Sequence, residues 1–164
     1  MARKDGLISE LQHEAATTRK VLERIPAETF DWKPHEKSMT MGQLSAHVAD
    51  MFSWVSATLD TDGLDFAAGY NQPNPATTEE LTALFDKNVA AATASLQKTD
   101  DENFMQNWTL RSGEQVFFTM MKIQVLRGMV MNHIIHHRGQ LSVYLRMNDI
   151  PVPGMYGPSA DEPM

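Results

Sequence analysis

The chain has 164 residues, of which 42% are hydrophobic, and a formal net charge of −7. These values predict one globular domain, spanning residues 1–164, with enough apolar side chains for a core. The acidic balance argues against nucleic acid as the main partner and against a basic helix on a membrane surface, because both need a positively charged face. No apolar run of about 18 residues is present, so we predict no membrane span.

The sequence contains no cysteine. Disulfides, thiolate zinc sites and a cysteine nucleophile are therefore excluded within this chain. The composition is compatible with a reducing compartment, and we expect a cytoplasmic protein. Any bound metal must be held by His, Asp or Glu side chains.

Two amphipathic helices are predicted in the first part of the chain. Residues 4–25 place their apolar side chains on one face at helical spacing, and Pro26 ends this helix. The second helix is predicted at 40–60. It begins with Thr40 and Gln43, which have the spacing of a capping box, a motif in which each side chain accepts a hydrogen bond from the other residue's backbone N–H.

A loop rich in Gly, Asn and Pro at 64–76 separates the second helix from a third, predicted at 77–98. Thr77 and Glu80 again have the spacing of a capping box. The loop is long enough to cross a helical bundle, so the second and third helices could run parallel to each other. The sequence alone leaves that order open.

The last part of the chain contains the longest predicted helix, at 120–147, and a Pro- and Gly-rich tail at 151–164. Before this helix, Ser112–Gly113 lies between two apolar segments and predicts a short hairpin or turn. The tail is expected either to lie over the bundle or to stay mobile. With four amphipathic helices, the predicted fold class is all-α: a four-helix bundle, with or without a crossover between helices two and three.

Three of the six histidines fall on predicted core-facing stripes. His133 and His137 lie about 40° apart on the last helix, and His47 has the equivalent position on the second helix. Clustered, buried imidazoles cannot all be charged, and each needs partners for its ring nitrogens. A divalent metal meets both needs, because each neutral imidazole donates a lone pair to it. We therefore predict a metal site on these three residues, with three merely packed histidines as the open alternative.

The remaining histidines are weaker candidates. His13 lies opposite the apolar stripe of its helix, and His35 falls in a loop. His136 sits at the edge of the last helix's stripe, where it could carry protons or simply be exposed. The residue after His133 is Ile134, so the metalloprotease motif H-E-x-x-H is absent.

No catalytic residue can be assigned firmly from the pattern. Asp50 and His136 are weak candidates, as a base and a proton carrier. Arg127 and Arg138 project more than about 100° from His133, so we predict that both lie on the surface. Residues that could orient a ligand or line a pocket, or simply pack, are Gln140, Trp54 and Tyr144.

Three segments resemble the DinB/YfiT-like superfamily. Residues 131–140, Met-Asn-His-Ile-Ile-His-His-Arg-Gly-Gln, are similar to the motif of that family's last helix. Residues 38–51, with Leu44 and His47, are similar to its second helix and single histidine ligand. The closing segment 151–159 also resembles DinB family members. The resemblance covers nearly the whole chain and is least distinctive in the middle loop.

The resemblance implies a four-helix bundle with a three-histidine metal site and, often, a homodimer. The family's ligand positions carry over to His47, His133 and His137. Zinc or nickel is favoured as the metal, with iron as a further candidate. Many relatives are regarded as metalloenzymes without a known substrate. Characterised branches include transferases and isomerases that use small thiols such as bacillithiol, mycothiol or glutathione.

Three hypotheses follow for the function. The first is a metal-dependent enzyme on a small molecule, either a thiol-dependent S-transferase or a hydrolase. The second is a non-catalytic metal-binding or stress-response protein, whose site would have a fourth protein ligand or be closed by the tail. The third is a bundle without metal. We favour the first, because three neutral ligands leave at least one coordination position open.

Overall fold

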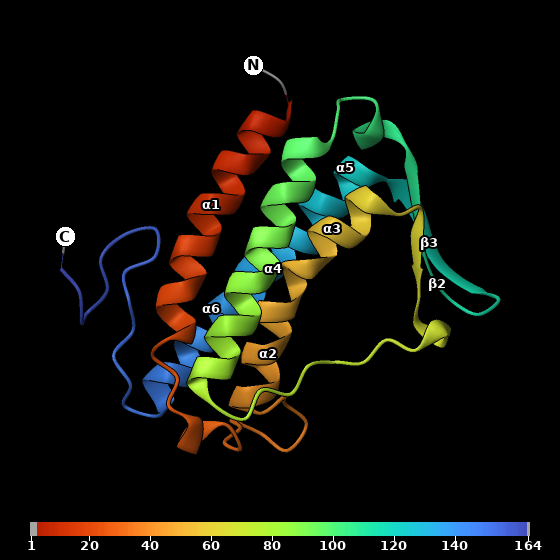
Figure 1. Ribbon diagram of the computed structural model, residues 1–164. Coiled ribbons are helices and arrows are strands. Elements are labelled where there is room, and N and C mark those ends of the chain that lie inside the picture. Colours follow the sequence, from red (N-terminus) through yellow and green to blue (C-terminus); the bar gives the residue numbers. More distant parts are fainter. Residues whose placement is uncertain (1–2, 164) are drawn as a thin grey trace.

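The computed structural model describes residues 3–163, which form four main helical segments and one small three-stranded sheet (Figure 1). The prediction of an all-α fold is therefore wrong, although helices dominate. The helices are α1 (Arg3–Leu22), α2 (Met41–Met51), α3 (Ser53–Asp60), α4 (Thr78–Lys98), α5 (Lys122–Gln124) and α6 (Asn132–Met147), with a π-helix, η4 (Val125–Met131), joining α5 to α6. The strands are β1 (Gly63–Asp65), β2 (Asn107–Ser112) and β3 (Gln115–Met121). Short 3-10 turns are η1 (Ala27–Thr29), η2 (Phe66–Ala68) and η3 (Asn103–Met105).

The order of the helices depends on one long connector. The helix predicted at 40–60 is divided into α2 and α3 by a break at Phe52. Both helices run in the same direction as α4 (Figure 1). After β1 and η2, the chain returns across the helices to the start of α4 at Thr78 (Figure 1). Helices α1 and α6 run in the opposite direction. The predicted second and third helices are thus parallel, which is the arrangement that a long loop permits.

The sheet lies beside α3, at the edge of the group of helices (Figure 1), and has two kinds of pairing. Strand β1 pairs with β2 in parallel, and β2 pairs with β3 as an antiparallel hairpin. Gly113 turns this hairpin with a φ of 56°, which glycine adopts without strain. At Gly63, an added Cβ would lie 2.4 Å from the Thr109 carbonyl oxygen, so the close approach of β1 to β2 requires glycine. The helix predicted from 120 begins at 122 because β3 extends to Met121.

Hydrogen bonds at two helix starts explain where those helices begin. The predicted capping box is confirmed at α2: Gln43 N donates to Thr40 Oγ1 at 3.2 Å, and Thr40 N donates to Gln43 Oε1 at 2.9 Å. At α4 only half of the predicted box forms. Glu80 N donates to Thr77 Oγ1 at 3.2 Å, but the Glu80 carboxylate accepts from Ala76 N instead. Both arrangements satisfy backbone N–H groups that lack a partner within the helix.

Arg138 corrects one prediction about the surface. Its side chain is 1% exposed and forms an ion pair with Glu14 on α1 at 2.7 Å. Arg138 also donates to Thr18 Oγ1 at 3.0 Å and to the Tyr156 hydroxyl at 2.5 Å. The prediction failed because α6 packs against α2 on one side and against α1 on another, so the helix has two buried faces.

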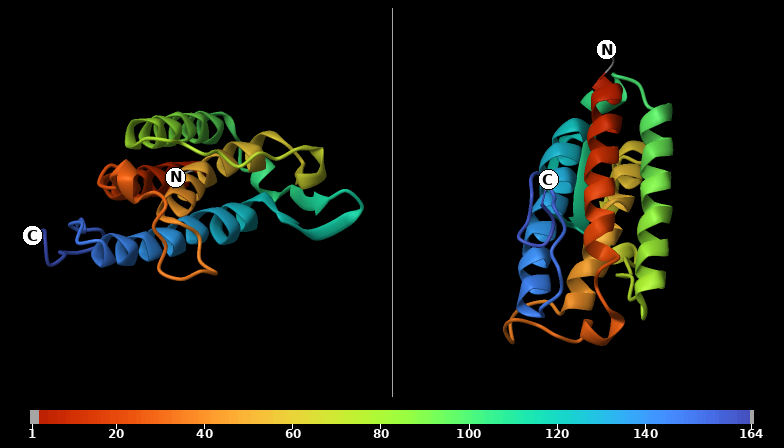
Figure 2. Two further views of the ribbon diagram at one scale, coloured as in Figure 1. Left: turned by 90° about the horizontal axis from the view of Figure 1, so that it is seen from below. Right: turned by 90° about the vertical axis from the view of Figure 1, so that its left-hand side faces the viewer.

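The C-terminal tail, to residue 163, lies along α1 and α6 (Figure 2). Tyr156 donates to Glu14 Oε2 at 2.8 Å, Glu162 pairs with Arg24, and Asp161 pairs with Arg146. These contacts hold the tail on the surface of the helices. Residue 164, at the end of the predicted tail, lies outside the described residues. None of the helices between residues 3 and 163 is both long and apolar enough to cross a membrane.

Candidate metal centre

His47 on α2 and His133 and His137 on α6 converge in space. One ring nitrogen of each lies within 4.8 Å of those of the other two. The ring centroids are 5.0 Å apart for His47 and His133, 4.9 Å for His47 and His137, and 4.6 Å for His133 and His137. All three side chains are half-buried. The helical periodicity that placed these residues on facing stripes therefore also brings them together.

The spacing and orientation of the rings fit a bound metal. The Nε2 atoms of His47 and His133 are 3.2 Å apart. Two imidazole nitrogens on one tetrahedral zinc, each at about 2.0–2.1 Å from it, would be about 3.3 Å apart. His133 Nδ1 donates to the Met129 carbonyl oxygen at 3.3 Å, and His137 Nδ1 donates to Gln140 Oε1 at 2.7 Å. Such bonds fix the tautomer in which Nε2 carries a free lone pair.

Electrostatics keep the three rings neutral. Burial, followed by the neighbouring charges of His137 and His133, lowers the pKa of His47 from 6.5 to about 4. Burial also lowers the pKa of His133 and of His137, although the bond to Gln140 acts in the opposite direction on His137. Neutral imidazole is the form that binds metal. The donor set is therefore ready to bind a cation near neutral pH.

The π-helix η4 directly precedes α6 and supplies the carbonyl oxygen of Met129 that holds His133. Single π-turns within helices occur often at functional sites. The apolar periodicity of residues 120–147 predicts a regular helix here and does not reveal this irregularity. Gly128 lies in the middle of this segment and is a poor helix former, so it is the one local sequence feature that indicates an irregular helix here.

A cavity of about 310 Å³ opens beside the histidines. Its walls come from α2, α3, β2, η2, η4, α6 and the connector before α4. The lining residues are His47, Met51, Trp54, Phe66, Tyr70, Gln72, Leu110, Met129 and His133. The site thus joins potential metal ligands to a space of the size that small-molecule sites have, which begins at about 300 Å³.

The weak catalytic candidates lie near the cluster but not in it. Asp50 is buried and accepts hydrogen bonds from the Tyr70 hydroxyl and, at 3.4 Å, from Ser53 Oγ. His136 is exposed, with its ring centroid 5.0 Å from that of His137. The contact of Tyr70 with Asp50 was missed because Tyr70 falls in an irregular loop, where no periodicity assigns a face. Burial, and then the hydrogen bond to Asp50, raises the pKa of Tyr70 to about 12.

The other candidate residues have different surroundings. Gln140 contacts His137, and Trp54 lines the cavity, whereas the Tyr144 hydroxyl donates to the Met39 carbonyl oxygen at 3.2 Å, away from the cavity lining. His13 and His35 are exposed. Neither joins the cluster of three.

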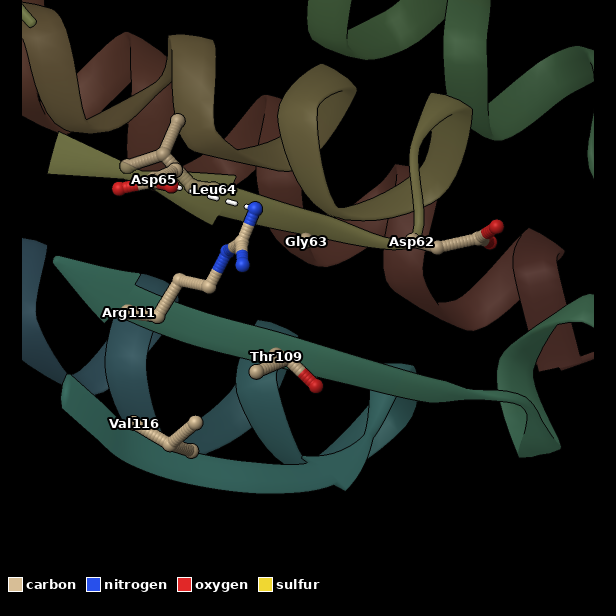
Figure 3. A pocket seen from close by; sticks show the side chains of 7 residues that line it. All are labelled: Asp62, Gly63, Leu64, Asp65, Thr109, Arg111 and Val116. Atoms are coloured by element: carbon tan, nitrogen blue, oxygen red, sulfur yellow. Dashed lines mark ion pairs between the residues drawn. The ribbon is translucent and has the colours of Figure 1, made fainter. Parts of the chain in front are cut away.

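A second cavity, of about 460 Å³, lies at the sheet (Figure 3). Its lining includes Asp62, Asp65 and Arg111. The Arg111 guanidinium already pairs with the Asp65 carboxylate at 3.2 Å, and no histidine lines this cavity. We therefore place the candidate site at the three histidines rather than at the larger cavity.

The fold and the site together define a helical protein with three clustered histidines beside a cavity. Residues 1–163 match the DinB family, and the chain belongs to that family. It is 24% identical over 158 residues to the uncharacterised protein YrdA of Bacillus subtilis, covering 96% of this chain and 90% of that protein. It is 23% identical over 146 residues to the uncharacterised protein YjoA of the same organism, covering 89% and 91%.

Two solved structures share the fold. A DinB-like protein from Bacillus cereus superposes with a TM-score of 0.71 at 21% identity, covering 93% of this chain and 97% of that chain. The structure of YjoA from Bacillus subtilis gives a TM-score of 0.70 at 19% identity, covering 89% and 95%. At these identities, the likeness supports the fold and carries no assignment of activity.

Proposed function

We propose that the protein is a divalent-metal-dependent enzyme acting on a small molecule. The observation that carries this proposal is that three neutral imidazoles converge beside a cavity that two of them line, while no carboxylate between residues 3 and 163 joins their cluster. Catalytic metal sites usually have three protein ligands and an open position, whereas structural sites are closed by four.

The same observation weighs against a non-catalytic metal-binding protein. That alternative calls for a fourth protein ligand or for a site covered by the tail. The tail's contacts go instead to Glu14 of α1, to Arg24 just after α1 and to Arg146 of α6. No residue of the tail lines the cavity beside the histidines.

His47, His133 and His137 would hold the metal, and we propose zinc or nickel, with iron as a further candidate. When bound, such an ion supplies positive charge that lowers the pKa of a bound water or holds a thiol as thiolate. Gln140 and the Met129 carbonyl keep the rings in orientation through the hydrogen bonds described above.

We propose a thiol-dependent S-transferase or a hydrolase as the reaction type, since both use an open coordination position. In the transferase, the sulfur of a small thiol forms a bond to an electrophilic carbon. The leaving group departs with the electron pair of the broken bond, and the thiol proton passes to solvent. We further propose that residues 1–164 form one domain and that two chains form a homodimer, as the family resemblance implies.

The test compares His47→Ala with His35→Ala, an exposed histidine outside the site. Each protein is loaded with zinc or nickel and assayed for conjugation of small thiols to an electrophile and for ester hydrolysis. We expect metal-dependent turnover in the wild type and in His35→Ala, and its loss in His47→Ala. Turnover that survives His47→Ala, or that does not require metal, would overturn the proposal.

A further inference from the structure

We propose that the cavity beside the three histidines binds an uncharged, apolar part of the substrate, such as an aromatic ring or a short alkyl chain. This inference rests on the proposed metal-dependent function and adds the chemical class of the substrate. It follows from the apolar and aromatic side chains that form most of the walls of the cavity and from the absence of charged side chains among its lining residues.

Three aromatic side chains form one continuous part of the lining. The ring centroids are 6.2 Å apart for Trp54 and Phe66, 6.5 Å for Trp54 and Tyr70, and 5.6 Å for Phe66 and Tyr70. At such separations aromatic rings attract one another and present a broad apolar surface. This surface suits a flat or aliphatic group of the ligand.

The rest of the apolar lining comes from Met51, Leu110 and Met129. Methionine side chains are unbranched and polarizable, so they adapt to the shape of an apolar ligand. Met51 and Leu110 are buried, which fixes these walls as part of the core. This part of the wall is therefore preformed, whereas Tyr70 and Gln72, on the connector before α4, line the cavity as exposed side chains.

No Asp, Glu, Lys or Arg lines this cavity. The nearby carboxylate of Asp50 is engaged by the Tyr70 hydroxyl. An ionised group that entered would lose water without gaining an oppositely charged protein side chain, which is unfavourable. The cavity at the sheet differs in this respect, because Asp62, Asp65 and Arg111 line it (Figure 3).

His47 and His133 contribute to the lining, so a ligand whose apolar part lies in the cavity places its polar end beside the ring nitrogens. Small thiols such as glutathione carry several charged groups. In a transfer reaction, we therefore assign the cavity to the apolar electrophile and not to the body of the thiol.

The first experiment measures the affinity of the purified wild-type protein for 4-methylphenol, 4-ethylphenol and 4-propylphenol, which are uncharged at neutral pH. Each added methylene that is fully buried should tighten binding about fourfold. The metal content of the same sample is measured independently. An affinity that does not change with alkyl length would overturn the assignment of the cavity.

The second experiment introduces the same charge inside and outside the cavity. Phe66→Asp should weaken binding of 4-ethylphenol at least tenfold. Val143→Asp, on the exposed face of α6 and outside the lining, should leave it within about twofold. Equal weakening in both variants would overturn the proposal. If Phe66→Asp does not fold, the wild-type series still decides.

The two proposals can fail separately. A protein that shows the alkyl-length dependence but holds no metal would overturn the metal-dependent function and support the apolar cavity. A protein that holds metal but shows no such dependence would overturn the apolar cavity alone.

Discussion

Replacing Arg138 by methionine should destabilise the protein strongly. The substitution removes the ion pair with Glu14 and the hydrogen bonds to Thr18 and Tyr156, and it leaves a 5% exposed Glu14 with fewer partners. Removing one partner of a buried ion pair costs about 3–5 kcal/mol. For a chain of this length, that cost corresponds to a fall in Tm of roughly 6–20 °C. Because Arg138 joins α6 to Glu14 and Thr18 of α1, the change also loosens the packing of α6 on α1.

Urea unfolding followed by circular dichroism would measure this effect. The matched control is Arg19→Met, because Arg19 also pairs with carboxylates, on Glu23 and Asp86, but has a side chain that is 43% exposed. Exposed pairs contribute about 1 kcal/mol or less. If Arg138→Met cost no more than Arg19→Met, the account of the buried pair would be refuted.

Three further predictions concern the site. Gln140→Ala should weaken metal binding about 10–100-fold in a chelator competition, because Gln140 orients His137. The control Gln12→Ala changes an exposed glutamine and should leave metal affinity unchanged. Equal metal affinities of the two variants would contradict this role of Gln140. In the metal-free protein, the pKa of His47 is about 4 in the folded chain and 6.5 in the unfolded chain. Between these pH values His47 is protonated in the unfolded chain but neutral in the folded chain. The urea midpoint should therefore fall on acidification through this window, and a rising midpoint would be inconsistent with a buried neutral ring. Tyr70→Phe removes the donor to buried Asp50 and should cost about 1 kcal/mol, measured by the same unfolding experiment; no change would show that this bond contributes little.

The regular helices explain why part of this structure could be predicted. His47, His133 and His137 were placed on core-facing stripes by a repeat of about 3.6 residues, and this repeat depends only on local backbone geometry. The capping box at Thr40 and Gln43 was readable for the same reason, since its hydrogen bonds join residues three apart.

The features that were missed depend on contacts between distant segments. Strand β1 is three residues long and pairs with β2, more than forty positions later, so no local pattern announces it. Arg138 looked exposed because a single stripe was assumed for a helix that packs on two sides. The hydrogen bond of Tyr70 to Asp50 depends on the path of the connector between η2 and α4, which sequence periodicity does not describe.

The central claim is that His47, His133 and His137 bind a metal ion. The most direct test is elemental analysis of protein purified without an affinity tag, beside the His133→Ala/His137→Ala double variant. We predict about one equivalent of a divalent transition metal per wild-type chain, and its loss in the variant. No metal in the wild type, even after incubation with zinc or nickel, would contradict the claim and leave the three histidines as packed side chains.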